Sequence, residues 1–178
     1  PGGTPERSFL EVGEDLVADV WDVMSGPARA QGSVLVYDDN GAEPALDAAE
    51  VLSLRGAAVE YVTPERTVGP SVGSMNSPAY LQAFAEHDVT VTLANRLIGV
   101  EAHPEGGLMA TLRSEYADVT AQRRVDRVVV AHGNTAVADL YLDLIPGSVH
   151  LGEVAQDALL AGRPQDVRTP EARRVGQP

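Results

Sequence analysis

The stretch from Val34 to Glu65 constrains the fold of this chain most strongly. An apolar run at Val34–Tyr37 precedes a polar turn, apolar residues at helical spacing then continue to Gly56, and a second apolar run covers Ala58–Val62. A continuous apolar run bounded by turn residues is typical of a strand that is buried on both faces. The pattern therefore predicts a strand–helix–strand unit with parallel strands and a right-handed crossover.

The order of the elements that follow extends this unit into a sheet. A helix is expected from Ser77 to about Glu86, a third strand over residues 89–93, and a further buried strand over residues 128–131. Between the last two strands, tight turns separate short alternating runs over about residues 96–124, which indicates a three-stranded antiparallel meander. This order predicts an α/β fold, a Rossmann-like parallel sheet with helices on both faces and an inserted meander. This order resembles the arrangement of a glutathione-reductase-like nucleotide domain.

Charge and composition exclude several classes of function. The chain of 178 residues has 26 acidic and 13 basic residues, a net charge of −13, and no cysteine. Without a basic cluster, we expect no nucleic acid and no anionic membrane as a partner. The lack of cysteine excludes disulfides, thiolate chemistry and iron–sulfur ligation within the chain. The first residues lack a basic and apolar signal segment and no apolar run approaches ~20 residues, so we expect a cytoplasmic protein.

The turn after the first strand departs from a dinucleotide-binding turn. Such a turn reads G-x-G-x-x-G, so that backbone N–H groups and a helix N-terminus meet the pyrophosphate. Here only Gly41 occurs, beside Asp38, Asp39 and Glu43. Each carboxylate near the phosphates would cost on the order of 1–4 kcal/mol, against about 8 kcal/mol for micromolar binding. Three interpretations remain: a structural domain with a degraded NAD(P) site, NAD(P) binding in a variant mode, or a role of the acidic turn in helix capping or partner contact.

Few other residues suggest a site. The acid that would bind a ribose belongs at the end of the second strand, where Thr63 lies, with Glu65 two residues later. Gly133 ends the last buried strand beside His132, at a position where ligands approach in such folds. We expect His132 to be held by local hydrogen bonds. The histidines show no metal-like spacing and no serine has a recognisable base, so we predict no catalytic residue and no metal ligand.

Five stretches carry a resemblance to a known family. They are "VLVYDDNG" (residues 34–41), "AAEVLSLRGAAVEYVTP" (48–64), "VTVTLANRLIGVE" (89–101), "VDRVVVAHGNTAVADLYLDL" (125–144) and "LGEVAQDALLAGR" (151–163). Together they resemble the carboxy-terminal nucleotide-fold region of the trimethylamine dehydrogenase group. That group belongs to the old-yellow-enzyme-like NADH:flavin oxidoreductase family, which includes 2,4-dienoyl-CoA reductase. The match covers most of residues 20–163.

The resemblance implies a place for this chain within a larger enzyme. Family members carry an amino-terminal TIM barrel with FMN and a cysteine-bound [4Fe–4S] cluster, followed by two nucleotide-fold domains. Residues 31–135 would be the second of these domains. Residues 1–30 would be a tail piece of the preceding domain or a linker, and residues 136–178 a return segment toward that domain with an irregular C-terminus.

The residue pattern and the resemblance together give six candidate cofactor-binding positions. Gly41, Thr63, Glu65 and Gly133 come from the turn and strand ends described above, and the resemblance adds Gly152 and Glu153, where the family has a Gly-Asp pair that contacts the ADP or FAD of the first nucleotide domain. The resemblance also implies partners. The partners would be the TIM-barrel portion and an electron-transfer flavoprotein.

The function implied is that of a C-terminal FAD/NAD(P)-binding-like domain, non-catalytic by itself, in an amine or N-methyl compound dehydrogenase or demethylase. Two alternatives stay open. One is a genuine NAD(P)H-binding domain of an enoate or dienoyl-CoA reductase, and the other is a structural or docking domain for an electron-transfer partner.

Overall fold

The structure, a computed structural model, describes residues 2–26, 32–147 and 155–163. The chain divides into two compact units, one of residues 5–135 and one of residues 1–4 with 136–178. The candidate site lies in the larger unit. Among the described residues, no helix has the length and apolar character that crossing a membrane requires.

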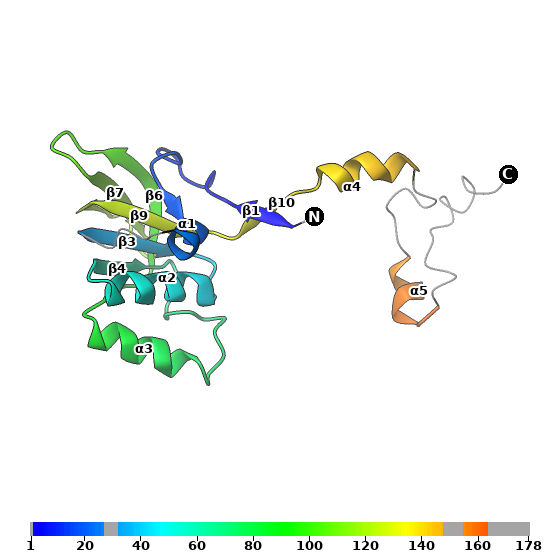
Figure 1. Cartoon of the computed structure of the whole chain (residues 1–178), viewed down its shortest axis with the longest axis horizontal. Helices are drawn as coiled ribbons and strands as arrows, with labels where there is room; N and C mark the ends of the chain where they lie inside the picture. Colours follow the sequence, from blue (N-terminus) through cyan, green and yellow to red (C-terminus); the bar gives the residue numbers. More distant parts are fainter. Residues whose placement is uncertain (1, 27–31, 148–154, 164–178) are drawn as a thin grey trace. The chain divides into compact units, whose positions relative to one another are not determined.

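A five-stranded parallel sheet forms the centre of the larger unit (Figure 1). Its strands, in spatial order, are β2 (Ala18–Asp19), β9 (Arg127–Ala131), β3 (Ser33–Asp38), β4 (Ala58–Val62) and β5 (Thr90–Thr92). All neighbouring pairs are parallel, and Val36 of β3 stands between Tyr61 of β4 and Val129 of β9. The chain runs from β3 to β4 on one side and reaches β9 on the other. The strand order therefore reverses between β3 and β9, which is where such sheets bind ligands.

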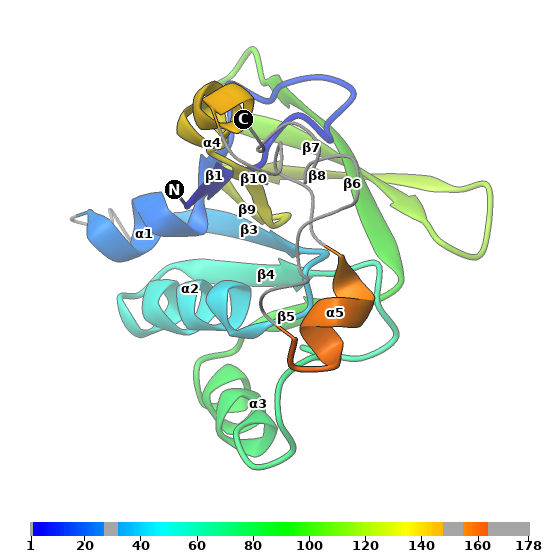
Figure 2. The same cartoon turned by 90° about the vertical axis from the view of Figure 1, so that its right-hand side faces the viewer.

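Each face of this sheet is covered by a different kind of layer (Figure 2). Helices α1 (Val20–Ser25), α2 (Glu43–Leu54) and α3 (Ser77–Glu86) pack on one face. The antiparallel meander of β6 (Asn95–Ala102), β7 (Leu108–Ser114) and β8 (Thr120–Val125) packs on the other.

The parallel sheet and the meander confirm the predicted fold class. The layering corrects one detail, because in this unit the second face carries the meander where helices were expected. Leu97, Val100 and Leu112 of the meander are fully buried against that face, so it is already covered.

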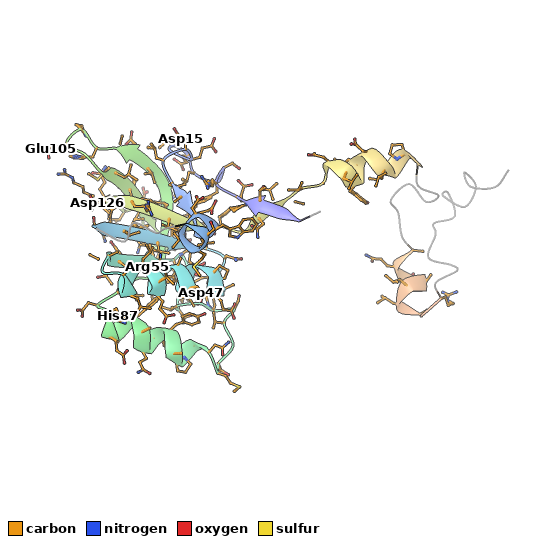
Figure 3. All side chains as sticks on the ribbon, viewed as in Figure 1. Asp15, Asp47, Arg55, His87, Glu105 and Asp126 are labelled. Carbon is orange, nitrogen blue, oxygen red and sulfur yellow. The ribbon has the colours of Figure 1, made fainter. Side chains whose placement is uncertain are left out.

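Local sequence explains the position of α2. Pro44 lies in its first turn, where the missing N–H of proline removes no intrahelical bond. Alanines 45, 48 and 49 are fully buried, so the helix lies close to the sheet. On its outer side, Asp47, which is labelled in Figure 3, accepts a hydrogen bond of 2.6 Å from the Tyr80 hydroxyl of α3, and this bond joins α3 to α2.

Residues 5–26, which the sequence assigned to a tail piece or linker, belong to the larger unit. Asp19 caps α1 through a capping box with Asp22, and the Arg7 guanidinium pairs with both carboxylates. The carbonyl of Val12 accepts the Val100 N–H at 3.0 Å, so the segment lies along the edge strand β6. These contacts tie the segment to α1 and to the meander.

The smaller unit has helices α4 (Asp139–Leu144) and α5 (Gln156–Leu160) and a short 3-10 helix at Ile145–Gly147. All residues of α4 are at least partly accessible to solvent. Strands β1 (Gly3–Pro5) and β10 (Asn134–Ala136) form a separate two-stranded sheet.

Gly13 is expected to be essential for placing the amino-terminal segment. It has φ +86°, and an added Cβ would lie 1.9 Å from the Val100 carbonyl oxygen. Gly56 has a similar φ of +90° but open space around it. In urea denaturation, we expect Gly56→Ala to lose about 1–2 kcal/mol, the cost of the left-handed conformation. Gly13→Ala should lose that amount plus about 1–3 kcal/mol from the clash. Equal losses for the two variants would contradict the described contact with β6.

Candidate functional site

The candidate site lies at the carboxyl ends of β3 and β9. Asp38 is the last residue of β3, and Asp39 begins the turn that leads into α2. His132 and Gly133 directly follow β9. Because β3 and β9 are adjacent and parallel, their ends bring these residues together at the point where the strand order reverses.

The Asp38 side chain points into the protein and is completely buried. Its Oδ1 atom accepts the Asn40 N–H at 3.0 Å and the Gly41 N–H at 2.8 Å, and its Oδ2 atom accepts the Tyr61 hydroxyl at 2.5 Å. In a dinucleotide-binding turn, backbone N–H groups at this place face the pyrophosphate. Here the carboxylate of the same turn occupies them.

Burial controls the ionisation of this cluster. It raises the pKa of the Asp38 carboxyl above its ordinary value, while hydrogen bonds from Tyr61, Gly41 and Asn40 act in the opposite direction. Burial also raises the pKa of the Tyr61 hydroxyl, and the nearby Asp38 carboxylate raises it further. Tyr61 is therefore a neutral donor at all physiological pH values, which suits a carboxylate acceptor.

The second acid of the turn forms a bridge across the crevice. Asp39 Oδ2 lies 2.7 Å from Nδ1 of His132, and the Tyr37 hydroxyl lies 3.4 Å from the same oxygen. The Phe9 ring stacks on the His132 ring with centroids 4.1 Å apart. The ends of β3 and β9 are thus joined directly, and the amino-terminal segment covers the histidine.

The space that remains is small. A cavity of about 40 Å³ lies among Trp21, Asn40, Pro44, His132 and Gly133. Pockets for small molecules and cofactors usually enclose about 300–1,000 Å³. A wider depression of about 500 Å³ is open to solvent, but Asp126 and other residues at the amino end of β9 line it, away from the acidic turn. The cavity beside the acidic turn is thus much smaller than such a pocket.

The structure places the candidate cofactor-binding residues as follows. Gly41 is buried in the turn, with its N–H on Asp38. Thr63 is fully buried, and its hydroxyl accepts the Glu65 N–H at 3.2 Å, whereas the Glu65 side chain is exposed. Gly133 lines the small cavity. Gly152 and Glu153 lie outside the described residues. Gly41 and Gly133 belong to the crevice, and Thr63 has no exposed surface for a ribose.

Sequence reasoning missed the partners of the two acids. Tyr61 reaches Asp38 from the neighbouring strand, 23 positions along the chain, and His132 reaches Asp39 from 93 positions away. His132 was expected to be held by local hydrogen bonds, but its partner is distant in sequence. The apolar runs held one usable signal for Tyr61. If the two strands pair in parallel, Tyr61 lies beside the end of β3. Among the described residues, no three His, Asp or Glu side chains gather in a way that could hold a metal ion.

Replacement of Tyr61 by Phe should destabilise the protein in a pH-dependent way. Because the folded-state pKa of Asp38 lies above its unfolded value, the stability from this group is present below about pH 4 and is lost as the pH rises through the folded pKa. Tyr61→Phe removes a donor that favours the carboxylate, so this loss should become larger. We expect the free energy of unfolding of the variant to be lower than that of the original chain by about 1.5–3 kcal/mol at pH 7, and by less near pH 4.

Urea midpoints between about pH 4 and 7 measure this difference. Tyr37→Phe is the matched control, since Tyr37 is an equally buried tyrosine of the same sheet and contacts Asp39 in place of Asp38. A Tyr61→Phe penalty that is the same at every pH would contradict the role given to Asp38.

Comparison with known proteins places this fold in a family. No family model matches the chain. It is 42% identical over 166 residues to a probable N-methylproline demethylase of Rhizobium meliloti, covering 93% of this chain and 24% of the relative. It is 35% identical over 163 residues to an N,N-dimethylglycine/sarcosine dehydrogenase of Chromohalobacter salexigens, covering 90% of this chain and 23% of the relative. The chain thus spans about a quarter of the length of the curated relatives it matches.

Solved structures agree with the fold. Histamine dehydrogenase from Rhizobium sp. 4-9 superposes with a TM-score of 0.69 at 21% identity, covering 82% of this chain and 22% of that protein. Thioredoxin reductase of T. acidophilum gives a TM-score of 0.57 at 11% identity, covering 77% of this chain and 43% of that protein. These similarities concern the fold, whereas the demethylase and dehydrogenase matches concern the sequence. Together they confirm the resemblance, and the chain belongs to the carboxy-terminal nucleotide-fold region of the trimethylamine dehydrogenase / 2,4-dienoyl-CoA reductase family.

Proposed function

We propose that this chain is the C-terminal FAD/NAD(P)-binding-like domain of a flavin- and iron–sulfur-dependent oxidoreductase, and that the domain binds no NAD(P). The observation that carries the proposal is the Asp38 carboxylate on the turn amides. A dinucleotide would have to displace a buried, hydrogen-bonded carboxylate and then bring its own negative charges to the same place. Both steps are unfavourable in a site of low dielectric.

The parent enzyme would oxidise an amine or an N-methyl compound. The names of the sequence relatives, a demethylase and a dehydrogenase of methylated amino acids, support this substrate class. A domain without an NAD(P) site also fits an amine oxidation whose electrons leave to a carrier protein, such as an electron-transfer flavoprotein. The enoate-reductase alternative needs NAD(P)H as the electron donor and therefore an open crevice in this or another domain.

The redox groups would be held elsewhere in the parent. This chain has no cysteine, so its residues do not fit an iron–sulfur cluster. FMN and the cluster would belong to the TIM-barrel portion, and ADP or FAD to the preceding nucleotide domain. The role of the present domain is then structural, with the Asp39–His132 bridge and the buried Asp38 keeping its ligand crevice closed.

Calorimetric titration of the purified chain with NADH, NADPH and ADP tests the proposal. We expect no binding tighter than roughly 100 micromolar, which corresponds to about 5–6 kcal/mol. Inorganic pyrophosphate is the fourth probe, because it needs only the turn. Asp38→Gly removes the competing carboxylate and should gain about tenfold in pyrophosphate affinity over the original chain. Saturable NADH or NADPH binding by the original chain below 100 micromolar would overturn the proposal.

A further inference from the structure

The acidic turn has a second chemical property that concerns Asn40 and Gly41. In an Asn–Gly pair, the glycine backbone nitrogen can attack the side-chain carbonyl carbon of the asparagine. A new C–N bond closes a five-membered succinimide, and the side-chain nitrogen leaves as ammonia with the proton of the backbone amide. Water then opens the ring to aspartate or isoaspartate. Glycine makes this attack easy because it has no side chain to hinder its nitrogen.

Asn40 is exposed, but the attacking nitrogen of Gly41 is held on several sides. Its N–H donates to Asp38 Oδ1 at 2.8 Å, and the Gly41 carbonyl accepts the Ser71 N–H at 2.8 Å. The loop after β4 also packs on the turn, because a Cβ at Gly41 would lie 2.8 Å from Cγ of Pro70. The peptide unit that must rotate toward the Asn40 side chain is therefore fixed.

The charge of Asp38 opposes the same reaction. Attack requires the Gly41 nitrogen to lose its proton, which creates negative charge at that atom. The Gly41 N–H donates this proton in a hydrogen bond to Asp38 Oδ1, and the low dielectric around the buried carboxylate strengthens the repulsion between the two negative charges. Asp38 thus accepts a hydrogen bond from the Gly41 N–H and also disfavours the negative charge that loss of this proton would create on the nitrogen.

We propose that Asn40 is a deamidation site of this protein and that the Asp38 carboxylate slows its deamidation in the folded chain. The reaction would add a negative charge beside Asp39 at the mouth of the crevice. Isoaspartate would also lengthen the backbone by one carbon atom between the two amides that Asp38 binds. Deamidation would therefore break the hydrogen bonds that Asp38 makes with the turn.

The test compares rates of deamidation at residue 40 at mildly alkaline pH. The full chain and a synthetic peptide of residues 36–44 are incubated in parallel, and peptide mapping by mass spectrometry localises the exchange of nitrogen for oxygen. We expect the folded chain to react about tenfold or more slowly than the peptide, because the turn must open before the nitrogen can attack. Equal rates in chain and peptide would overturn the proposal.

Two variants test whether the Asp38 carboxylate in particular, or any nearby carboxylate, slows the reaction. Asp38→Asn keeps the size of the side chain and removes its charge, and should raise the rate at Asn40 about threefold or more. Glu43→Gln removes another acid of the same region, at the first residue of α2, and should leave the rate near that of the original chain. An unchanged rate in Asp38→Asn, or an equal acceleration in both variants, would contradict the role of Asp38.

A further measurement covers the case in which Asp38→Asn does not fold, which circular dichroism detects. Hydrogen exchange of the Gly41 amide is then followed in the original chain. Slow exchange of that amide supports the proposal, because it shows that the nitrogen stays bonded. Exchange at the rate of an unstructured peptide would overturn the proposal without any variant.

Discussion

The conformation of the turn after β3 depends on one buried carboxylate, that of Asp38. Asp38 accepts three hydrogen bonds, two from the amides of its own turn and one from Tyr61 on the neighbouring strand. A buried carboxylate is costly unless donors surround it, and here the turn itself provides them. The same amides are the groups that a phosphate-binding turn needs. In the function proposed above, the interaction that stabilises the turn is also the one that keeps its amides from a nucleotide.

Other contacts of the larger unit hold the ends of β3 and β9 in place. The sheet order places β9 beside β3, so that His132 meets Asp39 across the position where the strand order reverses. Phe9 then covers His132 because Arg7 fastens the amino-terminal segment to the cap of α1. The meander covers the second face of the sheet, and Trp21, Pro44 and His132 line the small cavity at the crevice. The nucleotide fold is thus retained, while Asp38 accepts the N–H groups of the turn and the Asp39–His132 pair bridges the ends of β3 and β9.

The order of the strands and helices could be predicted from sequence, whereas the side-chain contacts of the candidate site could not. The apolar run at Val34–Tyr37 and the tight turns of the meander are local signals, and both elements occur where they were expected. From sequence we expected Asp38 to repel a phosphate at the turn, but its buried side chain accepts a hydrogen bond from Tyr61 on another strand. Pairings across 23 and 93 positions, and the segment held by Arg7, depend on tertiary contacts that no local pattern encodes.

The most direct test of the account is the response of the Asn40 and Gly41 amide resonances to pyrophosphate in solution NMR. The amides report on the carboxylate that binds them, since a change of acceptor alters the proton shift. If Asp38 holds both amides, their resonances follow a single ionisation above the ordinary aspartate pKa, and pyrophosphate leaves them unchanged. Saturable shifts of both resonances on addition of pyrophosphate would show that the turn is open to phosphate and would contradict the account.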